Sequence, residues 1–566
     1  QFEFFGEIMN LDKKLEMADN LVTQNKLDAA IKKYCEIQII TKDSIDEGND
    51  YKIWFLQQTY FYLGLLYTKV GYKDKAIESY RDGQNNKFNI FTRQACAINL
   101  ASLYAEIGKE QEAIETLKAI RRNNESEMIY SYAQIGLADI YMDIDKNKAL
   151  RCLQKIRLGD NLDIYSKAKY TIAMNCDDLD HAIDQLEMIP EYSELYSDAG
   201  YFLKIFKKLE ALRSDELSYL MLCITQNVGN IMEKLFVSSL YEESIAHYTN
   251  LTVSKLMLAV SEPDSFGVSR SCSPLRLNTI NLMNDPKEGL LIDNLLNIDQ
   301  KTTTKDLAFI SCFTLHHDSL NQFRLYAKEH QKEAFGVSLV LNKLFFAQKH
   351  NYLNLPDNKK EETKKTINLN KEYLNPLPLY RCIYIDPTSG LVKVAQREEW
   401  SFRREFKIKN KEKWTTLNEA ADRKWEFYKE SIEKIEKGVR EKLEKLIELI
   451  NQLKAHKDFN KSTSKLLAEI ILPIRYLMKH FAFKEEQECR IVYVTQIDNP
   501  LIQYDKNINR VYINYEPSVM EYLEKIYIAP KAKGEKMIFQ YLCTRGQEIR
   551  KGKPPVKVKI SQNPFR

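Results

Sequence analysis

A step of 37 residues recurs through the first part of the chain and restricts its fold more than any other feature. Two sets of large residues keep this step, namely Leu63, Leu100 and Leu137, and Tyr67, Tyr104 and Tyr141. A small residue follows each leucine directly: Gly64, Ala101 and Ala138. Small residues at one repeated position let two helices approach closely, and units of this length stack on one another. The period therefore predicts pairs of packed helices, with Gly71 and Gly108 in the turns within the pairs.

Two further copies extend the repeated part in both directions. An earlier copy covers residues 17–34, and a looser one contains Ala182, Leu186 and Pro190. The pattern resembles the tetratricopeptide repeat. That resemblance implies a superhelix over residues 9–235 whose concave groove binds a protein or a peptide. An unrelated helical bundle is the alternative.

The chain after residue 240 has a different pattern. Short apolar runs such as AFGVSLVL and CRIVYV alternate with turns and short helices, which is typical of strands in an α+β domain. The expected fold class is thus a helical-repeat (TPR-like) superhelix followed by an α+β domain over residues 240–566.

A helical hairpin is predicted as an insertion in the second domain, over residues 423–480. Between residues 423 and 453, apolar side chains are three and four positions apart in alternation, which is the seam of a coiled coil. The apolar helix over residues 464–480 is the favoured partner of this seam. The alternative partner is a second copy of the chain, which would give a homo-oligomer.

Charge and cysteine content argue against several classes of protein. The 83 Lys and Arg residues nearly balance the 79 Asp and Glu residues, so the chain lacks the basic excess of a nucleic-acid binder. Its ten cysteines are scattered without a C-x-x-C pair, which is typical of buried thiols in a reducing compartment. No apolar run approaches the roughly 18 residues that a membrane span needs. We therefore expect a cytoplasmic protein without a metal site or a membrane segment.

Polar residues interrupt the apolar runs of the second domain at four places. These are IAHYTN (245–250), NDPKEG (284–289), FISCFTL (309–315) and EQECR (486–490). Together with the tail KIYIAPKAKGEKMIFQYL, they resemble a widespread, uncharacterised family of bacterial domains. Their order is also similar to that of ADP-ribosyltransferases, whose DNA-targeting toxins have a comparable early H-x-T strand. This second resemblance implies a cleft that binds NAD as a co-substrate.

The resemblance also implies roles for individual residues. Glu488 would accept a hydrogen bond from the ribose 2′-OH and stabilise the positive charge that develops as nicotinamide leaves, and Glu486 would orient or deprotonate the acceptor. The residues implied in NAD binding are His247, Tyr248, Thr249, Arg276, Ser311 and Phe313. The residues implied in supporting the cleft are Asn284, Asp285, Arg324, Tyr326 and Arg490. The middle strand reads S-C-F-T instead of the common Ser-Thr-Ser, which weakens the assignment of Ser311 to the nicotinamide ribose.

The stretch FKEEQECRIVYV has two interpretations. In a strand, Glu486, Glu488 and Arg490 share one face, and the apolar residues between them share the other. The charged face is then either a solvated ladder of ion pairs or the edge of an active site. Its charges must be exposed or paired with one another, and a cleft satisfies either condition.

Two functions fit these patterns. The first is a repeat-built sensor arm joined to an NAD-using effector, which transfers ADP-ribose to a macromolecule or hydrolyses NAD, as the resemblance suggests for bacterial anti-phage defence. The second is a non-catalytic interaction protein. The two differ at Glu488, because an effector without this carboxylate loses NAD turnover and stays folded, whereas a structural ladder loses stability.

Overall fold

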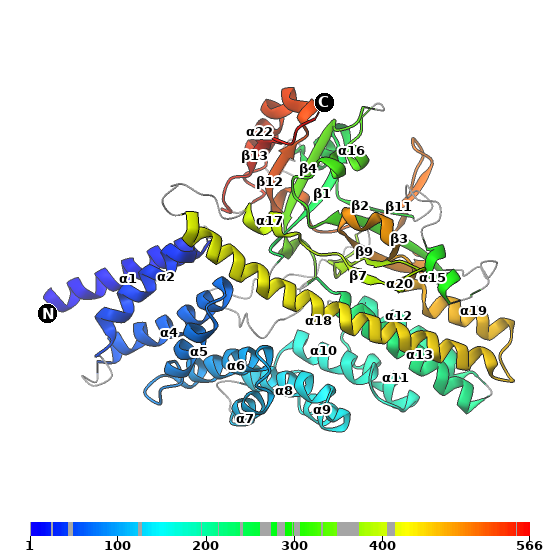
Figure 1. Ribbon diagram of the computed structural model, residues 1–566, viewed down its shortest axis with the longest axis horizontal. Coiled ribbons are helices and arrows are strands. Elements are labelled where there is room, and N and C mark those ends of the chain that lie inside the picture. The colour runs from blue at the N-terminus through cyan, green and yellow to red at the C-terminus, as the bar shows by residue number, and fades with distance from the viewer. Residues whose placement is uncertain are drawn as a thin grey trace.

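The computed structural model places helices in the first part of the chain and most strands in the second (Figure 1). It describes residues 2–565 apart from 24–26, 44–48, 123–126, 194, 213, 238–241, 261–272, 280–288, 297, 299–305, 330–331, 348–372, 405–413 and 551. We call residues 2–236 the helical region and residues 242–565 the sheet region. The long helix α18 (Trp414–Ala455) runs along the boundary between them (Figure 1).

Consecutive helices of the helical region pack on one another in a stack. The helices are α1 (Phe2–Thr23), α2 (Leu27–Thr41), α4 (Asp50–Val70), α5 (Lys73–Asp82), α6 (Ile90–Glu106), α7 (Glu110–Lys118), α8 (Glu127–Met142), α9 (Lys146–Leu153), α10 (Leu162–Ala173), α11 (Leu179–Glu187), α12 (Tyr196–Glu210) and α13 (Asp215–Leu235). Polar side chains begin several of them: Asn89, Asn161 and Ser214 accept hydrogen bonds from backbone N–H groups in the first turns of α6, α10 and α13. The prediction of helix pairs is confirmed for this part of the chain.

The repeated glycines serve the purposes that the pattern predicted. Gly71 ends α4 with a φ of 84°, and Gly108 lies in the turn after α6 with a φ of 78°. Both values are in the left-handed region, which residues with a side chain disfavour. Gly64 lies against the next helix, where a Cβ atom would be 2.3 Å from Cε1 of the buried Tyr80. The small residue therefore sets the distance between α4 and α5.

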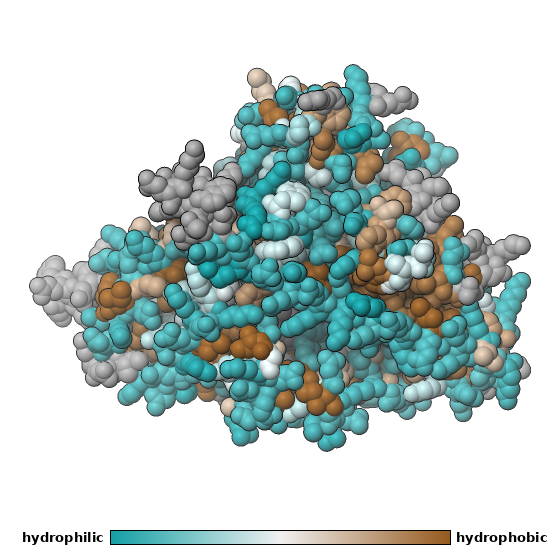
Figure 2. Space-filling view, viewed as in Figure 1, coloured by the Kyte–Doolittle hydropathy of each residue, from teal (hydrophilic) through white to brown (hydrophobic). Residues whose placement is uncertain are grey.

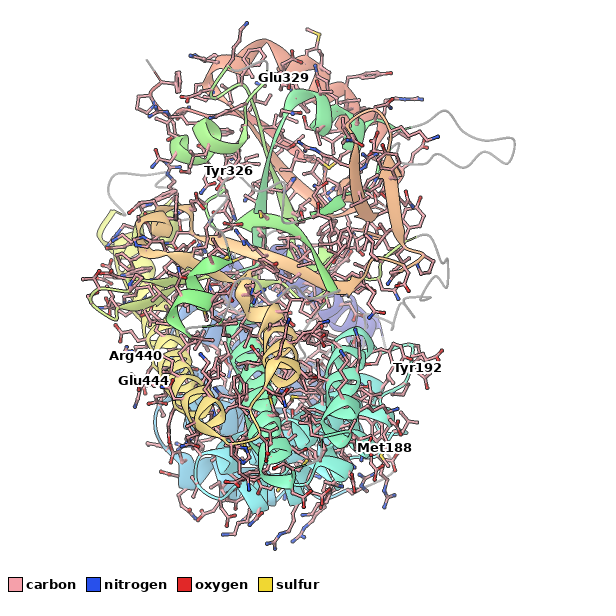
Figure 3. All side chains as sticks on the ribbon, turned by 90° about the vertical axis from the view of Figure 1, so that its right-hand side faces the viewer. Met188, Tyr192, Tyr326, Glu329, Arg440 and Glu444 are labelled. Atoms are coloured by element: carbon pink, nitrogen blue, oxygen red, sulfur yellow. The ribbon has the colours of Figure 1, made fainter. Side chains whose placement is uncertain are left out.

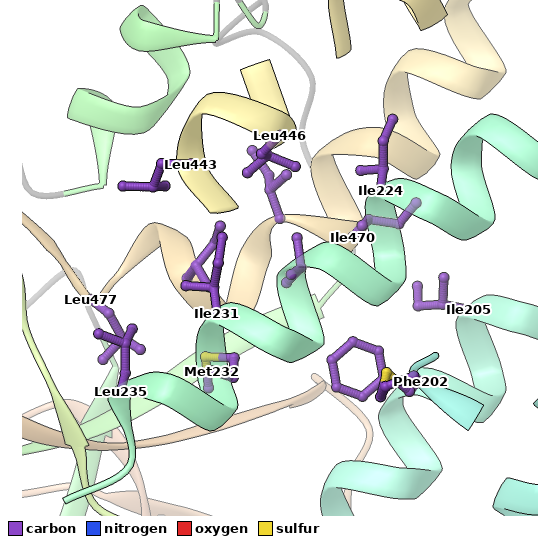
Figure 4. Packing of buried hydrophobic residues seen from close by; sticks show 14 of the residues in the cluster. Phe202, Ile205, Ile224, Ile231, Met232, Leu235, Leu443, Leu446, Ile470 and Leu477 are labelled. Carbon is purple, nitrogen blue, oxygen red and sulfur yellow. The ribbon is translucent and has the colours of Figure 1, made fainter. Parts of the chain in front are cut away.

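The seam of α18 is buried within this chain. Its apolar residues, among them Tyr428, Val439, Leu446 and Leu453, belong to one core with α12 and α13. Helix α13 is its main partner, so the expectation that the 464–480 segment covers the seam is wrong. That segment forms α19 (Lys461–Ile470), α20 (Leu472–Arg475) and a strand, and it packs on α13 as well (Figure 4).

Among the described residues of the second part, ten strands form one sheet. Its strands are β1 (Ser244–Asn250), β2 (Arg276–Thr279), β3 (Asp306–Thr314), β4 (Gly336–Asn342), β5 (Tyr380–Arg381), β9 (Glu488–Gln496), β10 (Ile502–Asp505), β11 (Arg510–Asn514), β12 (Leu523–Ile528) and β13 (Lys557–Ile560). The order is β10-β11-β2-β3-β1-β4-β12-β13, and β9 pairs with β3 and β5. Strand β3 pairs with β9 along its whole length, while β2 and β1 share its other edge. The expected α+β character is thus present.

A small second sheet connects the two regions. It contains β6 (Ile383–Ile385), β7 (Val392–Val394) and β8 (Met478–His480) in the order β7-β6-β8. Its apolar residues share a core with α12, α13 and α18, so the helical and sheet regions are joined by continuous packing. The remaining short helices of interest are α14 (Leu251–Leu258), α16 (Leu320–Tyr326), α17 (Glu399–Arg403), η4 (Phe481–Glu486) and α22 (Lys536–Arg545).

The visible surface is mostly hydrophilic, and its hydrophobic patches are separated by polar side chains (Figure 2). Within the described ranges, no helix combines the length and the apolar character needed to cross a bilayer.

Candidate active site

Strand β9 carries charged residues on one face and core residues on the other. Its register on β3 places Glu488 opposite Thr314 and Arg490 opposite Cys312. Residues that face each other in an antiparallel pair project to the same side, so these four share a face. The predicted alternation is confirmed for Glu488 and Arg490. Glu486 lies outside the strand, because it is the last residue of η4 and Gln487 has a φ of 45° before β9 begins.

Four charged residues form a cluster at the start of β9. We call Glu486, Glu488, Arg490 and Lys479 the carboxylate cluster. Arg490 Nε lies 2.7 Å from Oε1 of Glu488, and Lys479 Nζ lies 2.5 Å from its Oε2. Lys479 also donates to Glu486. Two carboxylates and two cations therefore neutralise each other in one network.

The burial of this cluster bears on one of the two interpretations of the sequence. The exposed fractions are 9% for Glu486, 4% for Glu488 and 0% for Arg490. A solvated ladder is thus excluded, and the charges are paired within the protein. Each charged group loses its hydration on burial, which is unfavourable. The short ion pairs and the hydrogen bond that Arg490 Nη1 donates to the Tyr476 carbonyl (2.6 Å) offset this loss.

The two carboxylates differ in their affinity for a proton. Burial alone would raise the pKa of Glu488, but the cations of Arg490 and Lys479 outweigh it and hold that pKa well below its usual value. Burial raises the pKa of Glu486, and the negative charge of Glu488 raises it further against the opposing effect of Lys479. Glu488 is therefore held as an anion, and Glu486 is the carboxylate of the pair that binds a proton more readily.

Hydrogen bonds from three elements fix the backbone at Glu486. Its carbonyl accepts from Thr314 Oγ1 of β3 and from Gln322 Nε2 of α16, both at 2.8 Å. The side-chain carbonyl of Gln487 accepts from the Gln396 amide at 2.6 Å. This arrangement holds Glu486 in place at the end of η4, where the left-handed Gln487 turns the chain into β9.

A surface pocket of about 240 Å³ opens beside Glu486. Helix α16 and η4 supply most of its lining, which consists of Asn321, Gln322, Arg324, Leu325, Glu333, Ala482, Phe483, Glu485 and Glu486. Arg324 is more than half exposed and pairs with Glu333, 3.2 Å away. Phe483 is 37% exposed and offers part of its ring to the pocket. A carboxylate, a guanidinium and an aromatic ring thus line the same opening.

Tyr326 lies beside the carboxylate cluster and hydrogen-bonds Glu486. It ends α16 in the sheet region, close to Glu329 and far from Arg440 and Glu444 of α18 (Figure 3). Burial raises its pKa, and the charges of Glu488 and Glu486 raise it further. The phenol of Tyr326 therefore stays neutral and donates a hydrogen bond to Glu486 of the carboxylate cluster. The structure thus brings five predicted site residues together: Glu486, Glu488, Arg490, Arg324 and Tyr326.

The predicted residues of the early strand β1 contact the neighbouring strands and the turn after β3. The Tyr248 hydroxyl donates to the His316 carbonyl and accepts from the Ser319 amide, each at 2.9 Å. His247 projects to the other side of β1, where Nδ1 lies 2.9 Å from the Cys312 carbonyl. Thr249 is buried opposite Val337 of β4. These contacts hold the strand and the turn after β3 and do not line the pocket.

Ser311 and Phe313 are separated from the carboxylate cluster by the strand itself. They lie opposite Ile491 and Cys489 of β9, on the face away from Glu488. The ring centroids of Phe313 and His247 are 5.4 Å apart, whereas those of Tyr248 and Phe323 are 5.0 Å apart. Tyr248 and Phe313, both implied in NAD binding, thus do not face each other, because neighbouring strands send these two side chains to opposite faces.

The other predicted binding residues also lie elsewhere. Arg276 pairs with Asp505 at 2.8 Å and lies over the ring of Tyr512 at 4.0 Å, at the β2–β11 pairing. Asn284 and Asp285 fall outside the described residues. No group of three or more His, Cys, Asp or Glu side chains in the described ranges is arranged to hold a metal ion.

Sequence reasoning missed several members of the site. Lys479 comes from β8 and contacts both glutamates. The Glu488 amide donates a hydrogen bond of 2.8 Å to the hydroxyl of Tyr384 in β6. Cys312 stabilises the charged form of Glu488 by a hydrogen bond. The one local signal was Lys479 itself, a cation inside the apolar run YLMKHFAF. Its partner could not be read from the sequence.

Comparison with protein-family models and with curated proteins finds no match to this chain.

Proposed function

We propose that the chain is an NAD-consuming enzyme that transfers ADP-ribose or hydrolyses NAD, with Glu486 as its reacting carboxylate. One observation carries this proposal: Glu486, with a raised pKa, lines a pocket and is joined through Lys479 to the ionised Glu488. Two carboxyl groups held in different protonation environments are typical of glycosyl-transfer sites. This assigns the acid-base role to Glu486 and makes Glu488 a positioning residue.

The pocket suits the nicotinamide ribose end of the dinucleotide. Its volume of about 240 Å³ is below the roughly 300–1,000 Å³ of pockets that enclose a whole drug-sized ligand, so the adenosine end would lie outside it. Phe483 would contact the nicotinamide ring. Arg324 would exchange its exposed ion pair with Glu333 for the pyrophosphate, because exposed pairs are weak and guanidinium binds phosphate with two hydrogen bonds.

The chemistry breaks the bond between ribose C1′ and the nicotinamide nitrogen, and the bonding electron pair leaves with nicotinamide. The negative charge of Glu486 would stabilise the oxocarbenium-like carbon that forms. A water molecule or an acceptor hydroxyl then bonds to C1′ and gives its proton to Glu486. The proton later passes to solvent, so the carboxylate is regenerated.

Nicotinamide release from NAD by the purified full chain tests this proposal. We expect Glu486→Gln to lower the rate at least about 100-fold, because it removes both the charge and the base. Glu548→Gln, an exposed glutamate of the sheet region, is the matched control and should keep the wild-type rate. Full activity of Glu486→Gln would contradict the proposal.

The role of Glu488 has a separate readout. Its charge raises the pKa of Glu486, so Glu488→Gln should move the low-pH limb of the pH–rate profile to lower pH. A purely structural Glu488 would change the melting temperature and leave that limb in place. Arg324→Met should raise the KM for NAD with little effect on kcat, since the guanidinium would bind phosphate far from the broken bond.

A non-catalytic interaction protein is the second candidate. It is favoured by the complete pairing of Glu488, whose two oxygens are held by Arg490 and Lys479. In both cases we propose that the helical region is a tetratricopeptide-like arm that binds a protein or peptide, and that the setting is bacterial anti-phage defence, as the sequence resemblance implies. If calorimetry detects no NAD binding and no nicotinamide is released, the second candidate takes precedence.

A further inference from the structure

A cavity of about 90 Å³ lies where the helical region meets β5. Helices α8, α10, α12 and α13 supply one side, and Tyr380 of β5 belongs to the other. Most of the wall is apolar, including Met232 and the rings of Tyr170 and Phe236. The ring centroids of Phe236 and Tyr380 are 6.4 Å apart, so aromatic side chains of both regions share this wall.

Asp198 is the exceptional residue of this wall. It lies in the first turn of α12, and its hydrogen-bond partner is the Tyr380 hydroxyl, 3.0 Å away. Among the described residues, no cation lies within ion-pair distance of it. Burial raises the pKa of Asp198 to about 6, so the carboxylate is still charged at neutral pH. The wall therefore holds an anion that, within the described part of the chain, is stabilised by a neutral phenol and by the N-terminal end of α12.

When the other charged side chains of the wall are included, the net charge of the cavity lining is negative. Lys167 faces the cavity together with Asp163 and Glu233, which make contacts of their own. One ammonium thus stands against three carboxylates when Asp198 is included. Aromatic rings beside a carboxylate are the surroundings that proteins use to bind ammonium groups.

We propose that this cavity binds a small organic cation, whose ammonium pairs with Asp198 and whose apolar body lies between Tyr170, Phe236 and Tyr380. A space of about 90 Å³ holds several water-sized groups and excludes a nucleotide or a peptide. A metal ion fits less well, because the walls are mainly apolar and no three carboxylate, His or Cys side chains among the described residues are arranged to hold one.

The cavity is connected directly to the carboxylate cluster. Tyr380 pairs with Arg490 in the β5–β9 register, and the Cys382 amide donates to the Glu488 carbonyl at 3.0 Å. On the other side, the Val237 amide, just after α13, donates to the Leu379 carbonyl at 2.9 Å. A ligand that holds Asp198 and Tyr380 together therefore restrains β5 against β9. Ligand binding in the cavity would therefore affect the position of β9 at the candidate active site. This inference does not depend on the reaction proposed there.

Titration calorimetry of the full chain with n-butylammonium, and with n-butanol as the neutral counterpart of equal length, tests the binding. We expect saturable binding of n-butylammonium that is at least about tenfold tighter than that of n-butanol. Asp198→Asn should reduce the affinity for n-butylammonium about tenfold and should melt no lower than the wild type. Asp180→Asn, an exposed aspartate in the first turn of α11, is the matched control and should bind as the wild type does.

Three results would overturn the proposal: no saturable binding of n-butylammonium, equal binding of the two probes, or unchanged binding by Asp198→Asn. Hydrogen exchange tests the connection without any need for catalysis. Saturating n-butylammonium should slow exchange of the Cys382 amide in the wild type and leave it unchanged in Asp198→Asn. Equal exchange with and without the probe in the wild type would overturn the link to β9.

Discussion

The helical region and the sheet region bury different kinds of polar residue. Among the described residues between α2 and α13, the polar residues that are buried as whole residues are uncharged, as Asn99, Ser131 and Gln226 are, and the buried carboxylate of Asp160 is paired with Arg122. The sheet region buries the ion pair of Arg381 and Glu242, 2.6 Å apart, as well as the carboxylate cluster. Burial removes hydration from a charge, so charged groups are retained inside only where partners satisfy them. The first region therefore depends on apolar packing, and the second also depends on matched charges.

The matched charges fix the pairing of the central strands. A shift of β9 by one residue would turn Glu488 and Arg490 into the apolar core and expose Cys489 and Ile491 on the other face. The partners of Glu488 come from β8 and β9, and Cys382, just after β5, contacts its backbone. We infer that the cluster selects this one register among several apolar alternatives, a specificity that the local packing of a helix pair does not need.

Replacing Arg490 by methionine should have the largest effect on this comparison. The substitution keeps much of the side-chain volume but leaves Glu488 with one cation in a buried site. Removing one member of a buried pair typically costs about 3–5 kcal/mol, and we expect a loss of that size in the free energy of unfolding measured with urea.

Arg403→Met is the matched control, because Arg403 is exposed and pairs with Glu399 and Asp422 at the surface. It should cost less than about 1 kcal/mol. If the two arginine variants lost equal stability, the sheet region would not depend on its buried charges, and the contrast between the regions would fail.

Gly64→Ala tests the apolar packing of the helical region. The new Cβ would be 2.3 Å from the ring of Tyr80, which is fully buried and cannot move away freely. Overpacking of this kind costs about 1–3 kcal/mol. Gly200→Ala is the control: this glycine of α12 has no atom within 4 Å of its Cβ position, and alanine should stabilise the helix by about 0.5–1 kcal/mol.

Thermal melts of the two glycine variants give the comparison. Opposite shifts in melting temperature are expected from the same chemical change, because only Gly64 lies between two packed helices. Equal shifts would mean that the small residue in the 37-residue pattern does not set the spacing of α4 and α5.

The helices could be predicted from the sequence because their determinants are local. The step from Leu63 to Leu100, the glycines at the turns and the seam of α18 are all properties of short segments. The partner of that seam was predicted incorrectly, since 464–480 is the nearest apolar helix in sequence while α13 is nearer in space. Apolar periodicity identifies a face to be buried, but it does not identify what covers that face.

The candidate site could be predicted only where one strand defines it. Alternation placed Glu488 and Arg490 together, but Glu486 is brought beside them by the turn at Gln487 and not by the strand. Lys479 comes from β8, and the separation of Ser311 from Glu488 depends on the register of β3 on β9. Pairing across distant strands is set by the whole fold, so no spacing in the sequence encodes these contacts.

Asp198 is the residue that tests the comparison most finely, because it is a partly buried carboxylate of the helical region without a cation. Asp160 of the same region shows the usual arrangement, since Arg122 lies 2.6 Å from it. The pKa of Asp198 is raised to about 6 by burial, whereas an unfolded aspartate titrates near 3.9. Between these two values the folded chain binds more protons than the unfolded chain, so this residue makes the protein more stable as the pH falls from about 7 to about 4.

Asp198→Asn should remove that contribution. We expect the variant to be more stable than the wild type by about 1–2 kcal/mol at pH 7, an amount already reduced for the partial exposure of the group, and the gain should disappear near pH 4. Urea unfolding of both proteins across this range measures the difference, and Asp160→Asn should change stability in the opposite direction at pH 7. A gain for Asp198→Asn that did not vary with pH would show that the carboxylate carries no unfavourable charge in the folded chain. In that case the helical region would tolerate isolated charges as readily as the sheet region tolerates paired ones.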